Sequence, residues 1–149
     1  TLVTGYNPLE VIRIEAPADL FVVVLHPHIE VKTSDARAVL KPEISLKNAI
    51  TQIGNLGGFV AGLYTNDYDL IGRSMKDVLV EPYRKHLIPN FDLVKNVALS
   101  NRALGAGISG AGPSIFALCK GKKTAETVAN AMQNAFKETK IPYDIMFQK

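Results

Sequence analysis

One glycine-rich stretch in the last third of the chain carries the most specific chemistry that the sequence offers. It reads Gly105-Ala106-Gly107-Ile108-Ser109-Gly110-Ala111-Gly112-Pro113-Ser114 and leads directly into the apolar run 115–119. Glycine lets backbone N–H groups approach a ligand closely, so such a stretch can cradle an anion. A tight turn needs only one or two glycines, whereas this stretch has four in eight positions. We therefore expect a phosphate-binding loop in preference to a turn that uses glycine for its geometry alone.

The common nucleotide-binding loops do not fit this stretch. Gly105-x-Gly107-x-x-Gly110 matches the dinucleotide-binding fingerprint, but that fingerprint opens a helix, and here Pro113 and a strand-like run follow. A Walker loop would close with Gly-Lys-Ser or Gly-Lys-Thr, which is missing. The glycine loop of protein kinases does lie between strands, but the Val-Ala-Ile-Lys strand that should follow it is missing too. The stretch is better explained as the loop of a β-hairpin.

Two arginines on short helices are candidates for ligand contact. The residues 34–40 are expected to form a helix that Thr33 and Ser34 can cap. In that helix Arg37 stands one turn from Thr33, which is close enough for both to contact one small ligand. Arg84 lies in a second short helical segment that has a proline at its first position. An arginine on a short helix usually faces solvent, so helix position alone assigns neither arginine a role.

Other polar residues are expected to have structural roles. Asp35, Asp77 and Glu81 lie in caps and first turns, where a carboxylate stabilises a helix N-terminus. Ser109 has no base beside it at a recognisable spacing, so we do not expect a nucleophile there. The histidines show no metal-ligand spacing. We assign no catalytic residue and no metal ligand.

The hydrophobic pattern predicts the elements that must position these candidates. Ser45 should cap a long helix that reaches Tyr64, packs one face, and crosses a neighbour closely at its glycines Gly54, Gly57 and Gly58. Asp67 should cap a third helix that carries apolar positions as far as Leu79. Further helices are expected at Phe91–Ala98 and Ala125–Phe136. The predicted strands are Leu20–His26, continuous and apolar and so buried on both faces, Ala103–Ile108, Ser114–Lys120 and Tyr143–Phe147.

The order of these elements predicts an α+β fold. A strand, several helices, two strands, a helix and a last strand make a ferredoxin-like split βαβ unit, with extra helices inserted into its first crossover. Ahead of it, Thr4-Gly5-Tyr6-Asn7-Pro8 reads as a loop and Val11–Glu15 as a short strand.

Composition limits the classes of function. With 149 residues and 47% hydrophobic residues the chain fits one globular domain. Its longest apolar run, Leu20–Leu25, is six residues long, far too short to span a bilayer. The basic cluster Lys120-Gly121-Lys122-Lys123 lacks interleaved aromatics, and the single cysteine, Cys119, sits in a predicted core strand. We expect no nucleic-acid partner, no membrane contact, a cytoplasmic location and an unreactive core thiol.

Three segments together resemble the GHMP small-molecule kinases, the family that acts on galactose, homoserine, mevalonate and phosphomevalonate. The stretch 107–118 is similar to the third motif of that family. The segments Val31-Lys32-Thr33-Ser34-Asp35-Ala36-Arg37-Ala38-Val39-Leu40 and 77–89 resemble the corresponding parts of its homoserine kinase branch. The resemblance runs from about Leu20 to the end of the chain. It implies that residues 20–149 form the C-terminal domain of such a kinase and that residues 1–19 remain from a missing N-terminal half.

The resemblance also implies roles for the candidate residues. L-homoserine would be held by Arg37 and Arg84 through its carboxylate, with the hydroxyl of Thr33 beside them. The phosphoryl group and the substrate hydroxyl would lie near a nest of N–H groups formed by the loop residues Gly107, Ser109, Gly110, Ala111 and Gly112. ATP and Mg²⁺ would be bound mainly by the N-terminal half, which is also the implied partner within the same chain. Many members of the family are homodimers, so a homodimer is implied as well.

The chain departs from the family pattern in one important respect. It lacks the Pro-x-x-x-Gly-Leu-Gly-Ser-Ser loop and the acidic Mg²⁺ ligand of the N-terminal half. We therefore expect the chain alone to be inactive as a kinase. Three alternatives stay open: the C-terminal domain of a different GHMP kinase, a stand-alone ferredoxin-like module that binds an amino acid for regulation, and a plain assembly domain.

Overall fold

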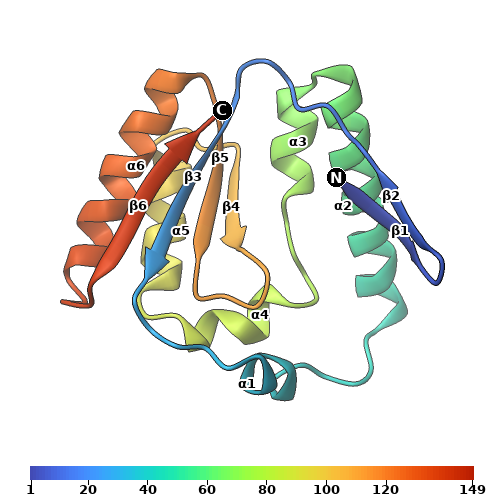
Figure 1. Cartoon of the computed structure of the whole chain (residues 1–149), viewed down its shortest axis with the longest axis horizontal. Helices are drawn as coiled ribbons and strands as arrows, with labels where there is room; N and C mark the ends of the chain where they lie inside the picture. Colours follow the sequence, from blue (N-terminus) through green and yellow to red (C-terminus); the bar gives the residue numbers. More distant parts are fainter.

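A four-stranded antiparallel sheet in the order β4-β5-β3-β6 forms the centre of the structure, a computed structural model that describes all residues from 1 to 149 (Figure 1). Helices α5 (Phe91–Ser100) and α6 (Lys122–Lys137) lie against one face of this sheet. The strand order is that of a split βαβ unit, which confirms the predicted ferredoxin-like α+β fold. The strands are β3 (Leu20–Pro27), β4 (Gly105–Ile108), β5 (Ile115–Lys120) and β6 (Tyr143–Gln148).

The hydrophobic core fills the space between the sheet and these two helices. Along β3, Val23 and Leu25 are fully buried, whereas His26 is exposed. The expectation that this strand is buried on both faces was therefore wrong, because helices cover only one face of the antiparallel sheet. Further core side chains are Phe136, Met132 and Val128 from α6, Phe91 and Val94 from α5, and Ile115 from β5.

Five helical segments of different lengths lie between β3 and α5. The sequence predicted extra helices in this connection. The Ser45 hydroxyl accepts a hydrogen bond from the Asn48 N–H, and Asp67 caps α3 in the same way through the Leu70 N–H. The third helix ends at Ser74, however, and does not reach Leu79. These elements are α1 (Thr33–Ala38), α2 (Leu46–Thr65), α3 (Tyr68–Ser74), α4 (Glu81–Arg84) and the 3₁₀ turn η1 (Lys85–Leu87).

The start of α1 also differs from the prediction. Lys32 is its N-cap residue, and no side chain caps it. Thr33 and Ser34 lie inside the first turn, so they do not serve as the predicted caps. The Ser34 hydroxyl donates to the Asp35 carboxylate at 3.2 Å, whereas the Thr33 hydroxyl makes no hydrogen bond within the protein.

Helix α2 packs against a neighbour along only part of its length. A side chain at Gly58 would collide with Ser74, and one at Gly62 with Ile71, so the two helices α2 and α3 do cross closely there. A Cβ atom added at Gly54 or Gly57 would meet nothing within 4 Å, so the predicted close crossing is wrong for these two. The predicted packing also fails in the first half of α2, where four apolar side chains are exposed: Leu46 by 75%, Ile50 by 62%, Ile53 by 68% and Leu56 by 54%. We call these four residues the α2 face.

The first residues form a hairpin that was not predicted. Strands β1 (Leu2–Tyr6) and β2 (Leu9–Ile12) pair antiparallel in a sheet of their own, and Tyr6 faces Leu9 across the turn. The expected loop is therefore only Asn7-Pro8, and the strand expected over 11–15 ends at Ile12. Most of the large apolar side chains of this hairpin are exposed. None of the helices in the structure has the length and apolar character that crossing a bilayer requires.

Candidate functional site

The predicted phosphate-binding loop is the turn of the β4–β5 hairpin. The Ser109 N–H donates to the Ser114 carbonyl at 2.8 Å, and the Gly112 N–H donates to the Ser109 carbonyl at 3.0 Å. Gly110 and Gly112 have φ values of +61° and +91°, in the region that favours glycine. The N–H groups of Gly110 and Ala111 find no acceptor within the protein. The loop therefore offers two free N–H donors at its tip, fewer than a nest running from Ser109 to Gly112 would have.

Arg84 connects this loop to α1. Its Nε donates to the Ala36 carbonyl at 2.9 Å, and its Nη1 donates to the Gly110 carbonyl at 3.1 Å. The side chain is half-buried between the two segments. A guanidinium has five N–H groups, so three remain for another ligand after these two bonds. The structure thus brings Arg84 and the glycine loop together, and α1, α4 and the hairpin turn lie at the same end of the molecule (Figure 1).

Thr33 and Arg37 lie on α1, next to the carbonyl that Arg84 holds. Both side chains are exposed, and neither makes a hydrogen bond or ion pair within the protein. They are therefore free to contact a ligand. Ala36, between them, is fully buried and fixes the side of α1 that faces the rest of the protein.

Asp77 has a structural role, as expected. Its carboxylate accepts from the N–H groups of Leu79 at 2.8 Å, Val80 at 2.9 Å and Glu81 at 3.1 Å. These bonds satisfy the donors at the start of α4. Asp77 therefore orders the turn that leads into the helix carrying Arg84.

One polar contact at the site was missed by the sequence analysis. His26 Nδ1 lies 2.8 Å from the Ser114 Oγ, where the hairpin turn joins β5. The signal was the register, because Leu25 pairs with Ile115 and the next residues along each strand then lie side by side. Asp144 does not complete a Ser-His-Asp arrangement, since its carboxylate binds His28 at 2.9 Å instead. No group of three His, Cys, Asp or Glu side chains lies close enough to hold a metal ion.

Cys119 is a core residue, as expected. Its side chain is fully buried, and this burial raises the pKa of the thiol to about 11. The thiolate is the reactive form of cysteine, so this residue is not a candidate nucleophile.

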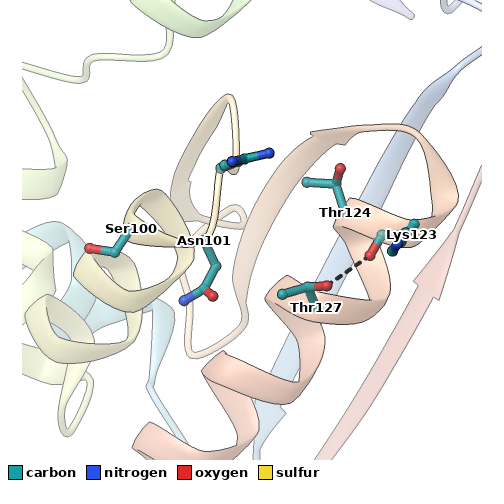
Figure 2. A pocket seen from close by; sticks show the side chains of 6 residues that line it. Ser100, Asn101, Lys123, Thr124 and Thr127 are labelled. Atoms are coloured by element: carbon teal, nitrogen blue, oxygen red, sulfur yellow. Dashed lines mark hydrogen bonds between the residues drawn. The ribbon is translucent and has the colours of Figure 1, made fainter.

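A hollow lies at the other end of the β4–β5 hairpin, away from the glycine loop. It has a volume of about 340 Å³ and is lined only by polar and charged side chains, with Thr127 donating to the Lys123 carbonyl at 3.0 Å (Figure 2). None of the predicted site residues lines it. The basic cluster nearby is engaged in ordinary surface contacts, since Lys120 lies 4.5 Å from the centre of the Tyr68 ring and Lys122 pairs with Glu126 at 3.9 Å. The hollow is lined by Ser100, Asn101, Arg102, Lys123, Thr124 and Thr127.

Comparison with known proteins identifies the family to which the chain belongs. Residues 59–138 match the model of the GHMP kinases C terminal family. The chain is 52% identical over 135 residues to the homoserine kinase of Chlorobaculum tepidum, and the match covers 91% of this chain but 42% of that enzyme. The chain therefore spans less than half the length of the curated relative.

Solved structures show the same similarity. The crystal structure of a homoserine kinase from Cytophaga hutchinsonii superposes with a TM-score of 0.96 at 48% identity, over 99% of this chain and 47% of that one. Streptococcus pneumoniae phosphomevalonate kinase superposes with a TM-score of 0.72 over 94% of this chain and 42% of that one, but at 13% identity, which shows the fold alone.

Proposed function

Because the chain belongs to the GHMP kinase family, in which it forms the C-terminal domain, we propose that it is the substrate-binding half of a homoserine kinase. The reaction is the transfer of the γ-phosphoryl group of ATP to the hydroxyl of L-homoserine, a step of threonine biosynthesis in the cytoplasm. The similarity to homoserine kinases at about half identity supports this choice within the family. The observation that carries it is Arg84, whose guanidinium lies between α1 and the glycine loop.

Arg84 and Arg37 bind the carboxylate of L-homoserine in this proposal. Arg84 keeps three N–H groups after its bonds to Ala36 and Gly110. Its position is already fixed by those bonds, so binding a carboxylate costs little side-chain entropy. Arg37 and Thr33 are exposed on the adjacent α1 and add a second guanidinium and a hydroxyl. A bidentate pairing with a carboxylate is the interaction for which the planar guanidinium is best suited.

The free N–H groups of Gly110 and Ala111 fit a phosphate oxygen. They lie at the tip of the hairpin beside Arg84, which adds positive charge. Gly107, Ser109 and Gly112 shape the loop. Phosphoryl transfer needs positioning and charge stabilisation more than covalent chemistry, so two N–H donors and a guanidinium are a suitable contribution from one domain.

The residues of this chain do not fit Mg²⁺ by themselves, because no three acidic, histidine or cysteine side chains converge. We propose that Mg²⁺ and most of ATP are held by an N-terminal half such as the relatives carry. The chain alone is then inactive. Residues 20–149 form the acceptor-binding domain, and the β1–β2 hairpin belongs with the N-terminal half.

The N-terminal half is also the proposed occupant of the exposed α2 face. The matched relatives are more than twice as long as the part that matches this chain. The four apolar side chains of the α2 face are largely exposed in the present structure. Burying them against a second domain would remove that apolar surface from water. The assembled kinase is proposed to be a homodimer.

The proposal is tested by joining this chain to the N-terminal portion of the Chlorobaculum tepidum homoserine kinase, which we call the fused enzyme. ATP-dependent phosphorylation is measured with L-homoserine, mevalonate and galactose. We expect phosphorylation of L-homoserine alone, and none of any acceptor by the chain without the N-terminal portion. Phosphorylation of mevalonate or galactose in preference to L-homoserine would assign the chain to another branch of the family.

A further inference from the structure

The ion pair between Glu81 and Lys95 is the most buried in the chain. The Lys95 Nζ donates to Glu81 Oε1, and the two side chains are exposed by only 20% and 14%, respectively. In every other ion pair of the structure at least one partner is more than 45% exposed. Glu81 is the first residue of α4 and Lys95 lies on α5. The pair therefore fastens α4 to one of the two helices that cover the sheet.

The second oxygen of Glu81 lies against β4. A Cβ atom added to Gly107 would be 3.3 Å from Glu81 Oε2, so the carboxylate occupies the space that the missing side chain leaves. Gly107 belongs to the strand that leads into the glycine loop. One carboxylate thus contacts α5 and β4 from the start of α4.

Helix α4 needs such contacts because it is a single turn. Its four residues form too few internal hydrogen bonds to keep the turn folded alone, and only contacts with other elements can set its orientation. Glu81 and Arg84 are three residues apart, so they lie on the same side of the helix. Glu81 reaches Gly107 while Arg84 reaches Gly110, and fixing the first of these contacts sets the rotation that produces the second.

Stability alone does not explain the pair. Removing two charges from water carries a large free-energy cost, and replacing a buried ion pair with apolar residues of similar size often leaves stability unchanged. An ion pair holds its two side chains in a specific geometry, whereas two apolar side chains do not. The engaged and largely buried carboxylate of Glu81 is also badly placed to accept a proton from a substrate.

We propose that Glu81 and Lys95 are positioning residues, which hold α4 in the rotation that places the Arg84 guanidinium between Ala36 and Gly110. The inference rests on the proposed function for its effect on catalysis, because Arg84 is the residue that contacts the substrate carboxylate. Its structural part concerns the chain alone.

The first test measures the structural part in the chain without any substrate. The readouts are the ¹⁵N–¹H signal of the Arg84 Nε–H and its hydrogen exchange, which report the bond to Ala36. In Glu81→Gln we expect this N–H to exchange about tenfold faster and the Gly110 amide signal to shift. The control is Asp92→Asn. It breaks the more exposed ion pair between Lys85 and Asp92, which also connects the segment around α4 to α5. Equal exchange in both variants would overturn the proposal.

The second test is a double-mutant cycle in the fused enzyme. Glu81→Gln should raise KM for L-homoserine about tenfold and leave KM for ATP within about twofold, because misplacing a binding group by a fraction of an ångström is costly. Adding Glu81→Gln to Arg84→Ala should cause no further rise, since Glu81 acts through Arg84. Asp92→Asn should have no effect in either background. A further rise in the double variant would show that Glu81 does not act through Arg84.

A third variant separates positioning from folding. Glu81→Leu combined with Lys95→Met removes both charges and leaves no unpaired charge. Its melting temperature should therefore be close to that of the unsubstituted fused enzyme. We expect it to raise KM for L-homoserine as Glu81→Gln does. An unchanged KM in this folded variant would overturn the inference even if the fused enzyme is a homoserine kinase. A fused enzyme inactive on L-homoserine would instead contradict the proposed function, and the exchange measurement would still decide the role of the pair.

Discussion

Arg84 donates a hydrogen bond of 3.1 Å from Nη1 to the carbonyl of Gly110, 26 residues further along the chain. This bond holds a guanidinium at the tip of the loop, where the N–H groups of Gly110 and Ala111 have no acceptor within the protein. Through Nε the same side chain holds the Ala36 carbonyl of α1. A cation fixed between a glycine loop and a helix with two free polar side chains is suited to an acceptor that carries a carboxylate.

The role of Arg37 is tested by Arg37→Ala in the fused enzyme. The side chain is exposed and makes no contact within the protein, so the free energy of unfolding should change by less than about 0.5 kcal/mol. KM for L-homoserine should rise about tenfold or more, because a charge-assisted hydrogen bond to the substrate is lost. Steady-state kinetics and thermal melting check both expectations. Arg102→Ala, an exposed arginine at the opposite end of the hairpin, should leave KM unchanged.

The backbone of the glycine loop is tested by two substitutions at Gly110. Its φ of +61° is unfavourable for alanine but tolerated by asparagine, although a Cβ there would meet nothing within 4 Å. We expect Gly110→Ala to lower the free energy of unfolding by about 1 kcal/mol and Gly110→Asn by less. Denaturant unfolding of the chain measures the difference. Equal losses for the two variants would mean that φ at this position does not control stability.

Burial of Cys119 predicts that its thiol is unreactive in the folded chain and that its contribution to stability depends on pH. Because the folded state raises the pKa of the thiol to about 11 from an ordinary 9.0, it favours the protonated form. The contribution of this thiol to stability is complete below pH 9 and is lost as the pH rises toward 11. Iodoacetamide at pH 8 should therefore modify Cys119 only after unfolding in urea, as mass spectrometry would show. Rapid modification of the folded chain would contradict the buried position.

The α2 face predicts a difference between the chain and the fused enzyme. Ile53 is 68% exposed here, so Ile53→Asp should change the stability of the chain by less than about 0.5 kcal/mol. If the N-terminal half covers this face, the same change should destabilise the fused enzyme by about 2 kcal/mol or more, because it buries a charge. Thermal melting of both proteins measures this. Thr51→Asp is the control, since Thr51 is exposed on another side of α2 and should be tolerated in both.

The sheet could be predicted from the sequence because β3 and β5 have continuous apolar runs, and because prolines, glycines or charged residues mark the breaks between strands. The hairpin of β1 and β2 could not: only part of β2 had a strand-like pattern, and the strands are short with side chains that stay exposed. The exposure of the α2 face could not be predicted either, because an apolar stripe predicts that a helix packs but does not specify what it packs against.

The residues of the candidate site could be named from the sequence, but the contacts between them could not. The glycine spacing marked the loop, and family resemblance marked Thr33, Arg37 and Arg84. The bonds of Arg84 to Ala36 and Gly110 depend on how α4 docks, and residue types do not specify this. The sequence also did not reveal that Ser109 and Gly112 use their N–H groups within the loop, because that follows from the turn conformation.

The claim that Arg84 holds the carboxylate of the acceptor has one direct test, which compares L-homoserine with 3-aminopropanol, the same molecule without its carboxylate. In the fused enzyme, Arg84→Ala should lower kcat/KM for L-homoserine about a hundredfold, as losing a charged partner costs several kcal/mol. The kcat/KM for 3-aminopropanol should fall far less, because without a carboxylate only the charge that Arg84 adds beside the phosphate-binding loop is lost. A fall of the same size for both acceptors would show that Arg84 does not recognise the carboxylate and would contradict the proposed substrate site.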